Sequence, residues 1–240
     1  MGLPLLITLF LVLPLAAGAW VRFRTTDPTH IKLLLAFSGA FLLGVTVLHM
    51  LPELYDRHHH HIGLWVLAGF MLQVVLEFFS QGIEHGHVHV HNHSHGQQQG
   101  HALPLLTFVS LFIHSFTEGM PFADPRVGGD RAFVAGVLLH KLPMAIALAT
   151  VLQQSAVSAT RSWATLAAFA MAAPAGILFG SFFGMDMGEE FLTAALAVAI
   201  GMLLHISTTI IFETTPDHRF NAKRFAAVLV GALLAILTGH

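Results

Sequence analysis

The chain has 240 residues, of which 55% are hydrophobic and only 10% are charged, and its net charge is −2. A soluble domain carries about 25% charged residues, so this composition predicts a polytopic membrane protein and excludes a basic nucleic-acid-binding surface. The chain has no cysteine, which excludes disulfides and thiolate metal sites and leaves imidazole, carboxylate, hydroxyl and thioether groups as candidate metal ligands.

Eight apolar segments are long enough, or nearly so, to cross the hydrocarbon core, which takes roughly 20 helical residues. They are 3–21, 31–54, 62–83, 102–123, 131–153, 163–184, 190–212 and 223–239. No Lys or Arg precedes the first segment, so we expect a retained helix and not a signal peptide. Because the connections are short, residues 1–240 are predicted to form a single all-α transmembrane domain.

The positive charges between the segments predict that both termini lie outside the cytoplasm. With the N-terminus outside, the cytoplasmic connections carry seven cations: Arg22, Arg24, Lys32, Arg161, Arg219, Lys223 and Arg224. The outer connections carry three, namely Arg57, Arg126 and Arg131. Lys141 lies inside the fifth segment and needs a separate explanation.

Two regions in the first half of the chain carry metal-ligand chemistry. His49 and Glu53, four residues apart near the outer end of the second segment, form either an entrance site for a cation or a polar helix end. The connection 85–101 between the third and fourth segments is predicted to be a cytoplasmic, His-rich loop. It is either a weak chelating loop or a solvated linker. Its candidate ligands are His85, His87, His89, His91, His93 and His95.

The fourth and fifth segments carry the strongest candidate site. His114 and Glu118 are one helical turn apart, and His140 and Met144 repeat this spacing on the next segment. If the two helices are antiparallel neighbours, then His114, Glu118 and His140 converge at similar depth, and two imidazoles with one carboxylate suit Zn²⁺. Met144 is either a weaker further ligand or a packing residue. A single intramembrane histidine often only donates a hydrogen bond to another helix, but three ionisable groups at this spacing favour a metal site.

Two further polar residues lie inside apolar segments. His205, in the seventh segment, is interpreted either as part of an exit path or as one side of an interhelical hydrogen bond. Glu77, in the third segment, is expected to be a structural partner for another helix.

The polar motifs resemble those of a known family. His114-Ser-Phe-Thr-Glu118-Gly is similar to the His-Asn-x-x-Glu-Gly signature of the ZIP (Zrt/Irt-like) divalent metal transporters, and His140-Lys-Leu-Pro143 resembles their fifth-helix motif. The second segment, with Ser38-Gly-Ala-Phe-Leu-Leu-Gly44 and His49-Met-Leu-Pro-Glu53, resembles their second helix. The resemblance spans the chain and implies uptake of divalent metal toward the cytoplasm, through eight transmembrane helices in a 3+2+3 inverted-repeat bundle.

The departures from the family pattern concern the number of metals. Some members are thought to hold two adjacent metals, with an Asn beside the fourth-helix His and acids on the fifth and sixth helices. Here Ser115, Lys141 and Met144 stand at matching positions, and 163–184 contains no acid. At an effective dielectric constant of about 20, two unit charges roughly 4 Å apart interact by about 4 kcal/mol, attractive for Lys141 with Glu118 and repulsive toward a second metal. We therefore predict a single metal site, with Ser115 among its candidate ligands and Lys141 as a mimic of the second cation.

The sequence thus favours a transporter whose substrate is Zn²⁺, with Fe²⁺, Mn²⁺ and Cd²⁺ as open alternatives, and not an enzyme. The expected location is the plasma membrane, or the inner membrane of a bacterium, and the expected partners are metal ions and lipid, with a homodimer left open. Two other classes remain as alternatives. A membrane-embedded zinc hydrolase would need a general base, and the usual His-Glu-x-x-His motif is absent. A metal sensor would bind the ion without moving it.

Overall fold

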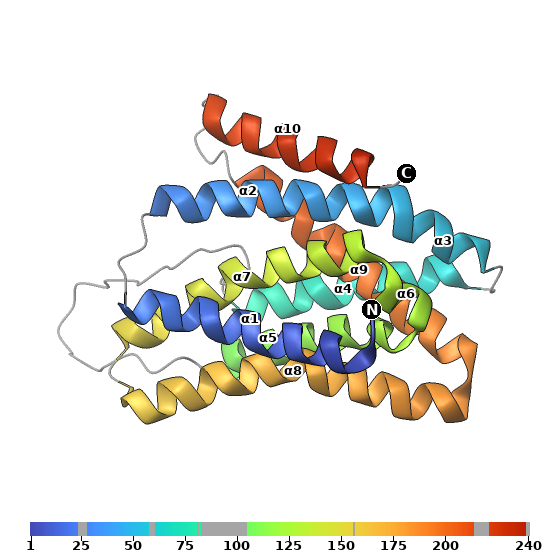
Figure 1. Cartoon of the computed structure of the whole chain (residues 1–240), viewed down its shortest axis with the longest axis horizontal. Coiled ribbons are helices and arrows are strands. Elements are labelled where there is room, and N and C mark those ends of the chain that lie inside the picture. Colours follow the sequence, from blue (N-terminus) through green and yellow to red (C-terminus); the bar gives the residue numbers. More distant parts are fainter. Residues whose placement is uncertain are drawn as a thin grey trace.

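The computed structural model describes residues 1–23, 28–57, 61–80, 82, 105–155, 157–213 and 221–238. Within these ranges the regular structure is entirely helical (Figure 1). The α-helices are α1 (Leu3–Phe23), α2 (Pro28–Val45), α3 (Leu51–Asp56), α4 (Ile62–Ser80), α5 (Leu105–Gly119), α6 (Pro125–Gly129), α7 (Arg131–Gln154), α8 (Ala159–Met187), α9 (Glu189–Glu213) and α10 (Ala222–Leu237). A π-helical turn, η1 (Thr46–Met50), joins α2 to α3, and a 3₁₀ turn, η3 (Met120–Ala123), follows α5.

Each predicted apolar segment coincides with a helix of the described chain, and six helical spans are long and apolar enough to cross a membrane. The other two segments correspond to α5, with 15 residues, and α10, with 16. At about 1.5 Å per residue these helices are about 22 and 24 Å long, somewhat short of the roughly 30 Å hydrocarbon core. The chain is therefore an integral, multi-pass membrane protein with six to eight spanning helices.

Two prolines set the helix boundaries near the polar motifs. Pro52 cannot donate a backbone hydrogen bond, and its ring would collide with the carbonyl of Leu48 in a regular helix. The π-helical turn η1 ends two residues before Pro52, and the second span continues from it into α3. The predicted helix 102–123 ends earlier than expected, at Gly119, and continues as η3, which contains Pro121.

The long helices pack in four main pairs: α2 with α10, α4 with α9, α1 with α7, and α5 with α8. In Figure 1, α10 and α2 lie along one edge of the bundle and α8 lies along the opposite edge. Further contacts join α1 to α8 and α2 to α9. The two shorter spans, α5 and α10, are thus each supported along a longer helix.

Glycines bring α5 and α8 into backbone contact. A Cβ atom at Gly176 would lie 2.0 Å from the carbonyl oxygen of Phe116, and one at Gly119 would lie 2.3 Å from that of Ala173. At about 100° per residue, Phe116 lies on the side of α5 opposite the face shared by His114 and Glu118, and Gly119 lies about 100° around the helix from Glu118. The close contact with α8 therefore turns the polar face of α5 away from α8.

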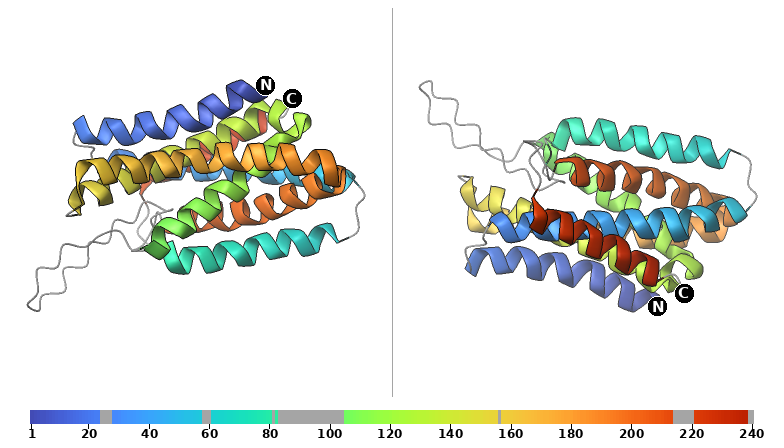
Figure 2. Two further views of the ribbon diagram at one scale, coloured as in Figure 1. Left: turned by 90° about the horizontal axis from the view of Figure 1, so that it is seen from below. Right: turned by 90° about the horizontal axis from the view of Figure 1, so that it is seen from above.

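The N-terminus and the end of α10 lie at the same end of the bundle, as both views in Figure 2 show. At this end the N-terminal ammonium donates a hydrogen bond to Gly128 O (3.0 Å). Arg57, with only 5% of its side chain exposed, forms ion pairs with Glu53 (3.1 Å) and Asp124 (2.8 Å). This network ties α3 to the segment between α5 and α7.

Candidate metal centre

The structure brings together the three ionisable residues that the sequence singled out on two different helices. His114 and Glu118 project from α5 and His140 from α7, and their exposed fractions are 0%, 2% and 0%. One ligand atom from each residue lies within 4.8 Å of the others. The two imidazole rings lie 5.9 Å apart between centroids, nearly perpendicular to each other. A cation with bonds of about 2 Å to nitrogen and oxygen holds its ligand atoms within about 4 Å of one another, so the three side chains need only a small shift to bind one.

Lys141 is the direct neighbour of the carboxylate. Its Nζ atom donates to Glu118 Oε2 and to Ser115 Oγ, each at 2.7 Å, and the side chain is only 1% exposed. Nζ also lies 5.7 Å from the ring centroid of Phe169 on α8, a cation–π distance. The ammonium therefore balances the buried carboxylate charge, which is the attraction that the sequence predicted. Ser115 contacts this ammonium through its hydroxyl oxygen.

The two carboxylate oxygens of Glu118 differ in their contacts. Its Oε2 atom is bonded to Lys141 and lies 3.7 Å from His114 Nε2. Its Oε1 atom is buried and has no hydrogen-bond partner among the described residues. A buried acceptor without a donor is unfavourable, and a bound cation would satisfy it. The donor set and this oxygen fit a divalent metal.

Gln73 on α4 completes the surroundings of His114 and was missed by sequence reasoning. The residue is fully buried, and its Oε1 atom lies 3.0 Å from His114 Nδ1. Because an amide oxygen only accepts, Nδ1 donates in this contact, and in the neutral ring the lone pair is then on Nε2, on the side of Glu118. Outer-shell partners of this kind orient metal-ligating histidines. The available signal was an amide one helical turn before Glu77 in a largely apolar segment.

The other His and Glu residues predicted for the site do not belong to this group of ligand atoms among the described residues. Met144 is buried and packs in an apolar cluster with Leu111 and Leu148. His49 lies in the π-helical turn, and Glu53 forms its ion pair with Arg57. The six histidines of the predicted chelating loop lie outside the described residues; they are His85, His87, His89, His91, His93 and His95.

His205 on α9 contacts Glu77 on α4 through Nε2 and Oε2. This is the interhelical contact that was one of the two alternatives for His205. It also gives Glu77 the structural partner on another helix that the sequence predicted.

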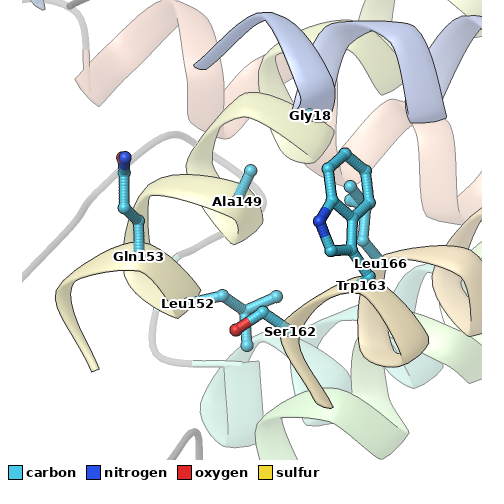
Figure 3. A pocket seen from close by; sticks show the side chains of 7 residues that line it. All are labelled: Gly18, Ala149, Leu152, Gln153, Ser162, Trp163 and Leu166. Carbon is cyan, nitrogen blue, oxygen red and sulfur yellow. The ribbon is translucent and has the colours of Figure 1, made fainter. Parts of the chain in front are cut away.

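A surface pocket lies between α1, α7 and α8, away from the ionisable cluster (Figure 3). Its α7 wall begins at Ala149, eight residues or about 12 Å along the helix from Lys141. The lining residues are Gly18, Ala149, Leu152, Gln153, Ser162, Trp163 and Leu166. This lining offers no carboxylate or imidazole, so the pocket is not part of the candidate metal centre.

Fold and site together define a multi-pass helical membrane protein with a buried cluster of two histidines and a carboxylate. The family model described as ZIP Zinc transporter matches residues 1–105 and 97–239, so the chain belongs to the ZIP zinc transporter family. This is a family of transporters and not of enzymes, in agreement with the expectation from sequence.

Individual relatives match over shorter stretches. The chain is 28% identical over 148 residues to zinc transporter ZIP13 of Pongo abelii, covering 55% of this chain and 42% of that protein. It is 32% identical over 86 residues to zinc transporter SLC39A7 of Homo sapiens, covering 27% of this chain and 18% of that protein. The chain thus spans less than half the length of these curated relatives.

Proposed function

We propose that this protein is a divalent metal transporter whose main substrate is Zn²⁺. It takes up the metal from outside the cell, or from the periplasm, and releases it to the cytoplasm. The ion crosses through a single intramembrane site formed by His114, Glu118 and His140. Membership of the ZIP family and the zinc transporters among the relatives support the substrate. Two imidazoles and one carboxylate suit zinc, whereas a site for Mg²⁺ or Ca²⁺ would consist of oxygen ligands.

The observation that carries the proposal is the convergence of the three ligand atoms within 4.8 Å in the buried interior of the bundle. Ionisable groups at membrane depth are unfavourable unless they are paired or functional. Lys141 balances the charge of Glu118, while the Oε1 atom of Glu118 has no hydrogen-bond partner among the described residues. Three protein ligands leave a fourth coordination position to water, and an incomplete ligand set favours release of the ion.

The proposal includes one metal and not two. Lys141 Nζ lies 2.7 Å from Glu118 Oε2, so it occupies the side of the carboxylate that a second, bridged ion would need. A second divalent ion in that place would be repelled by the ammonium. Ser115 belongs to the same contact, so we assign it to holding Lys141, and Met144 remains a candidate for a weak further ligand.

We also propose the 3+2+3 arrangement, with α1, α2 and α4 as one repeat, α8, α9 and α10 as the other, and α5 and α7 between them. The packing pairs support it, because α2 with α10 corresponds to α9 with α4, and α1 with α7 corresponds to α8 with α5. Both termini lie outside in this proposal, residues 1–240 form one transmembrane domain in the plasma membrane or bacterial inner membrane, and 85–101 face the cytoplasm.

The two other classes are less favoured. A hydrolase needs a carboxylate that is free to act as a general base toward metal-bound water, and Glu118 is held by Lys141. A sensor would not require ligands on two helices that lie at the centre of a spanning bundle.

Uptake of zinc by proteoliposomes that contain the full chain tests the proposal. His114→Ala should abolish zinc uptake, because it removes a ligand at the centre of the site. His30→Ala, which changes an exposed histidine of α2, should leave uptake unchanged. If His114→Ala took up zinc at the wild-type rate, the assignment of the site would be contradicted. If the wild-type protein bound zinc but did not accumulate it in the proteoliposomes, a sensor would be favoured over a transporter.

A further inference from the structure

A buried arginine joins three parts of the chain at the end of the bundle where the N-terminus lies. Arg57 directly follows α3, at the end of the second span. Its guanidinium donates to Glu53 Oε1 on the same helix (3.1 Å) and pairs with Asp124 Oδ2 (2.8 Å). It also donates to the hydroxyl oxygen of Thr193 on α9 (3.4 Å). Asp124 and Thr193 are both buried, so this contact is part of the closed interior at that end.

Asp124 lies on the connection between the two helices that carry the metal ligands. This connection runs from the end of α5 through η3 and α6 to the start of α7, and Asp124 is six residues after Glu118. Arg57 belongs to the second span, which packs against α10 and α9. The ion pair therefore fastens the ligand-bearing helices to the second span at this end of the bundle.

The metal centre is shut off from water in the structure, since its three ligand residues are all buried. For an ion to arrive from outside, side chains at the outer end of the bundle have to move apart. Two ion pairs hold the α5–α7 connection there among the described residues. Arg126 with Glu189 is largely exposed on both sides, and exposed ion pairs contribute little. Arg57 with Asp124 is the buried pair, so it is the stronger of the two closures.

Both members of the buried pair keep another partner when the pair separates. Glu53 lies one turn before Arg57 on the same helix and is partly exposed, so Arg57 retains an ion pair that water can reach. Asp124 Oδ1 accepts a hydrogen bond from the backbone N–H of Arg126, as the N-cap of α6. Breaking a buried ion pair is costly mainly when it leaves one charge alone. This pair is therefore suited to repeated opening and closing.

We propose that the Arg57–Asp124 ion pair is a latch, which closes the outer entrance to the metal centre and opens to admit the ion. This inference rests on the proposed transport function and its orientation. When the latch opens, Arg57 stays with Glu53 while Asp124 moves away with the connection between α5 and α7. When the latch is closed, the guanidinium places a positive charge at the entrance and repels a further divalent ion.

Two thiols introduced at the latch test it in transport, because the chain contains no cysteine of its own. In Arg57→Cys/Asp124→Cys, a bis-methanethiosulfonate reagent should bridge the two sides of the latch. The bridge should abolish zinc uptake by proteoliposomes, and a reducing agent should restore it. Arg57→Cys/Thr193→Cys is the matched control. It bridges the second span to α9, which packs against that span, so its zinc uptake should be equal with and without the bridge.

Opening of the latch can also be measured without transport. Thr193→Cys places a thiol at a buried position in contact with Arg57, where an alkylating reagent reaches it only when the entrance opens. Asp124→Asn removes the charge but keeps a good helix cap, so it should speed this alkylation at least about tenfold by raising the population of the open state. Arg126→Gln removes the exposed ion pair with Glu189 and should leave the alkylation rate unchanged.

The proposal is overturned if a bridge between positions 57 and 124 leaves zinc uptake unchanged, or if Asp124→Asn leaves the alkylation rate of Thr193→Cys unchanged. If the bridged variant does not fold, the alkylation rates decide alone. Absence of zinc uptake by the wild-type protein would reject the transport function, whereas the alkylation rates would still decide whether this ion pair closes the outer end of the bundle.

Discussion

Replacing Lys141 with methionine should make the protein less stable without metal and make zinc bind more tightly. At 2.7 Å and an effective dielectric constant of about 20, the attraction between Lys141 Nζ and Glu118 Oε2 is about 6 kcal/mol. Most of this is offset by desolvation, and removing one partner of a buried ion pair typically costs about 3–5 kcal/mol. We expect Lys141→Met to lose a similar amount of stability in metal-free buffer.

Zinc binding should respond in the opposite direction. The ammonium and a divalent ion at the centre repel each other by about 8 kcal/mol at roughly 4 Å and a dielectric constant of about 20. Even a fifth of this value amounts to about tenfold in affinity. Zinc should therefore bind Lys141→Met at least about tenfold more tightly than wild type, and saturating zinc should restore much of the lost stability.

Thermal unfolding with and without zinc, together with a zinc titration, measures both effects. All variants should carry asparagine in place of the six histidines between 85 and 95, so that the difference in zinc binding between Lys141→Met and its matched parent reports on the centre. Lys32→Met removes an exposed lysine of α2 and should change neither quantity. Equal zinc affinity in wild type and Lys141→Met would refute the interpretation of Lys141 as a cation mimic.

Three further predictions concern the centre and the packing of α5, which carries two of its ligands. Lys141→Asp exchanges the ammonium for a carboxylate and should raise the number of zinc ions in the centre from one to two, as measured by elemental analysis against wild type. An unchanged zinc content would argue against Lys141 as the reason for a single site. Gln73→Leu removes the acceptor for His114 Nδ1 and should lower zinc affinity about 10–100-fold in a zinc titration, whereas Gln73→Glu should retain most of the affinity. If Gln73→Leu bound zinc as tightly as wild type, Gln73 would have no role in positioning His114. Gly176→Ala places a Cβ atom 2.0 Å from a backbone oxygen of α5 and should cost about 1–3 kcal/mol of unfolding free energy. Gly129→Ala, whose Cβ would have no atom within 4 Å, should leave the unfolding free energy unchanged. Equal thermal stability of the two variants would contradict the tight α5–α8 contact.

The spanning helices were predictable because a membrane requires long apolar segments, and that requirement can be read directly from the sequence. Their ends were less predictable. The fourth segment was expected to run to 123, yet α5 ends at Gly119. A proline two residues further on marked this boundary, but local backbone geometry decides where a helix changes to a 3₁₀ turn.

The polar residues of the site could be recognised, but only some of their partners could. His114 and Glu118 share a face by their spacing, and a short connection made His140 a neighbour. The contact of Gln73 with His114 depends on how α4 packs against α5, and no periodicity in the sequence encodes that choice. For the same reason Glu77 and His205 were both singled out, while their pairing needed the structure.

Anomalous X-ray scattering from crystals of the zinc-bound protein would locate the metal without relying on a transport assay. We expect one zinc peak between α5 and α7, within bonding distance of His114, Glu118 and His140, with Lys141 beside the carboxylate. Two fully occupied zinc ions between these helices, or a peak that none of the three residues ligates, would contradict it.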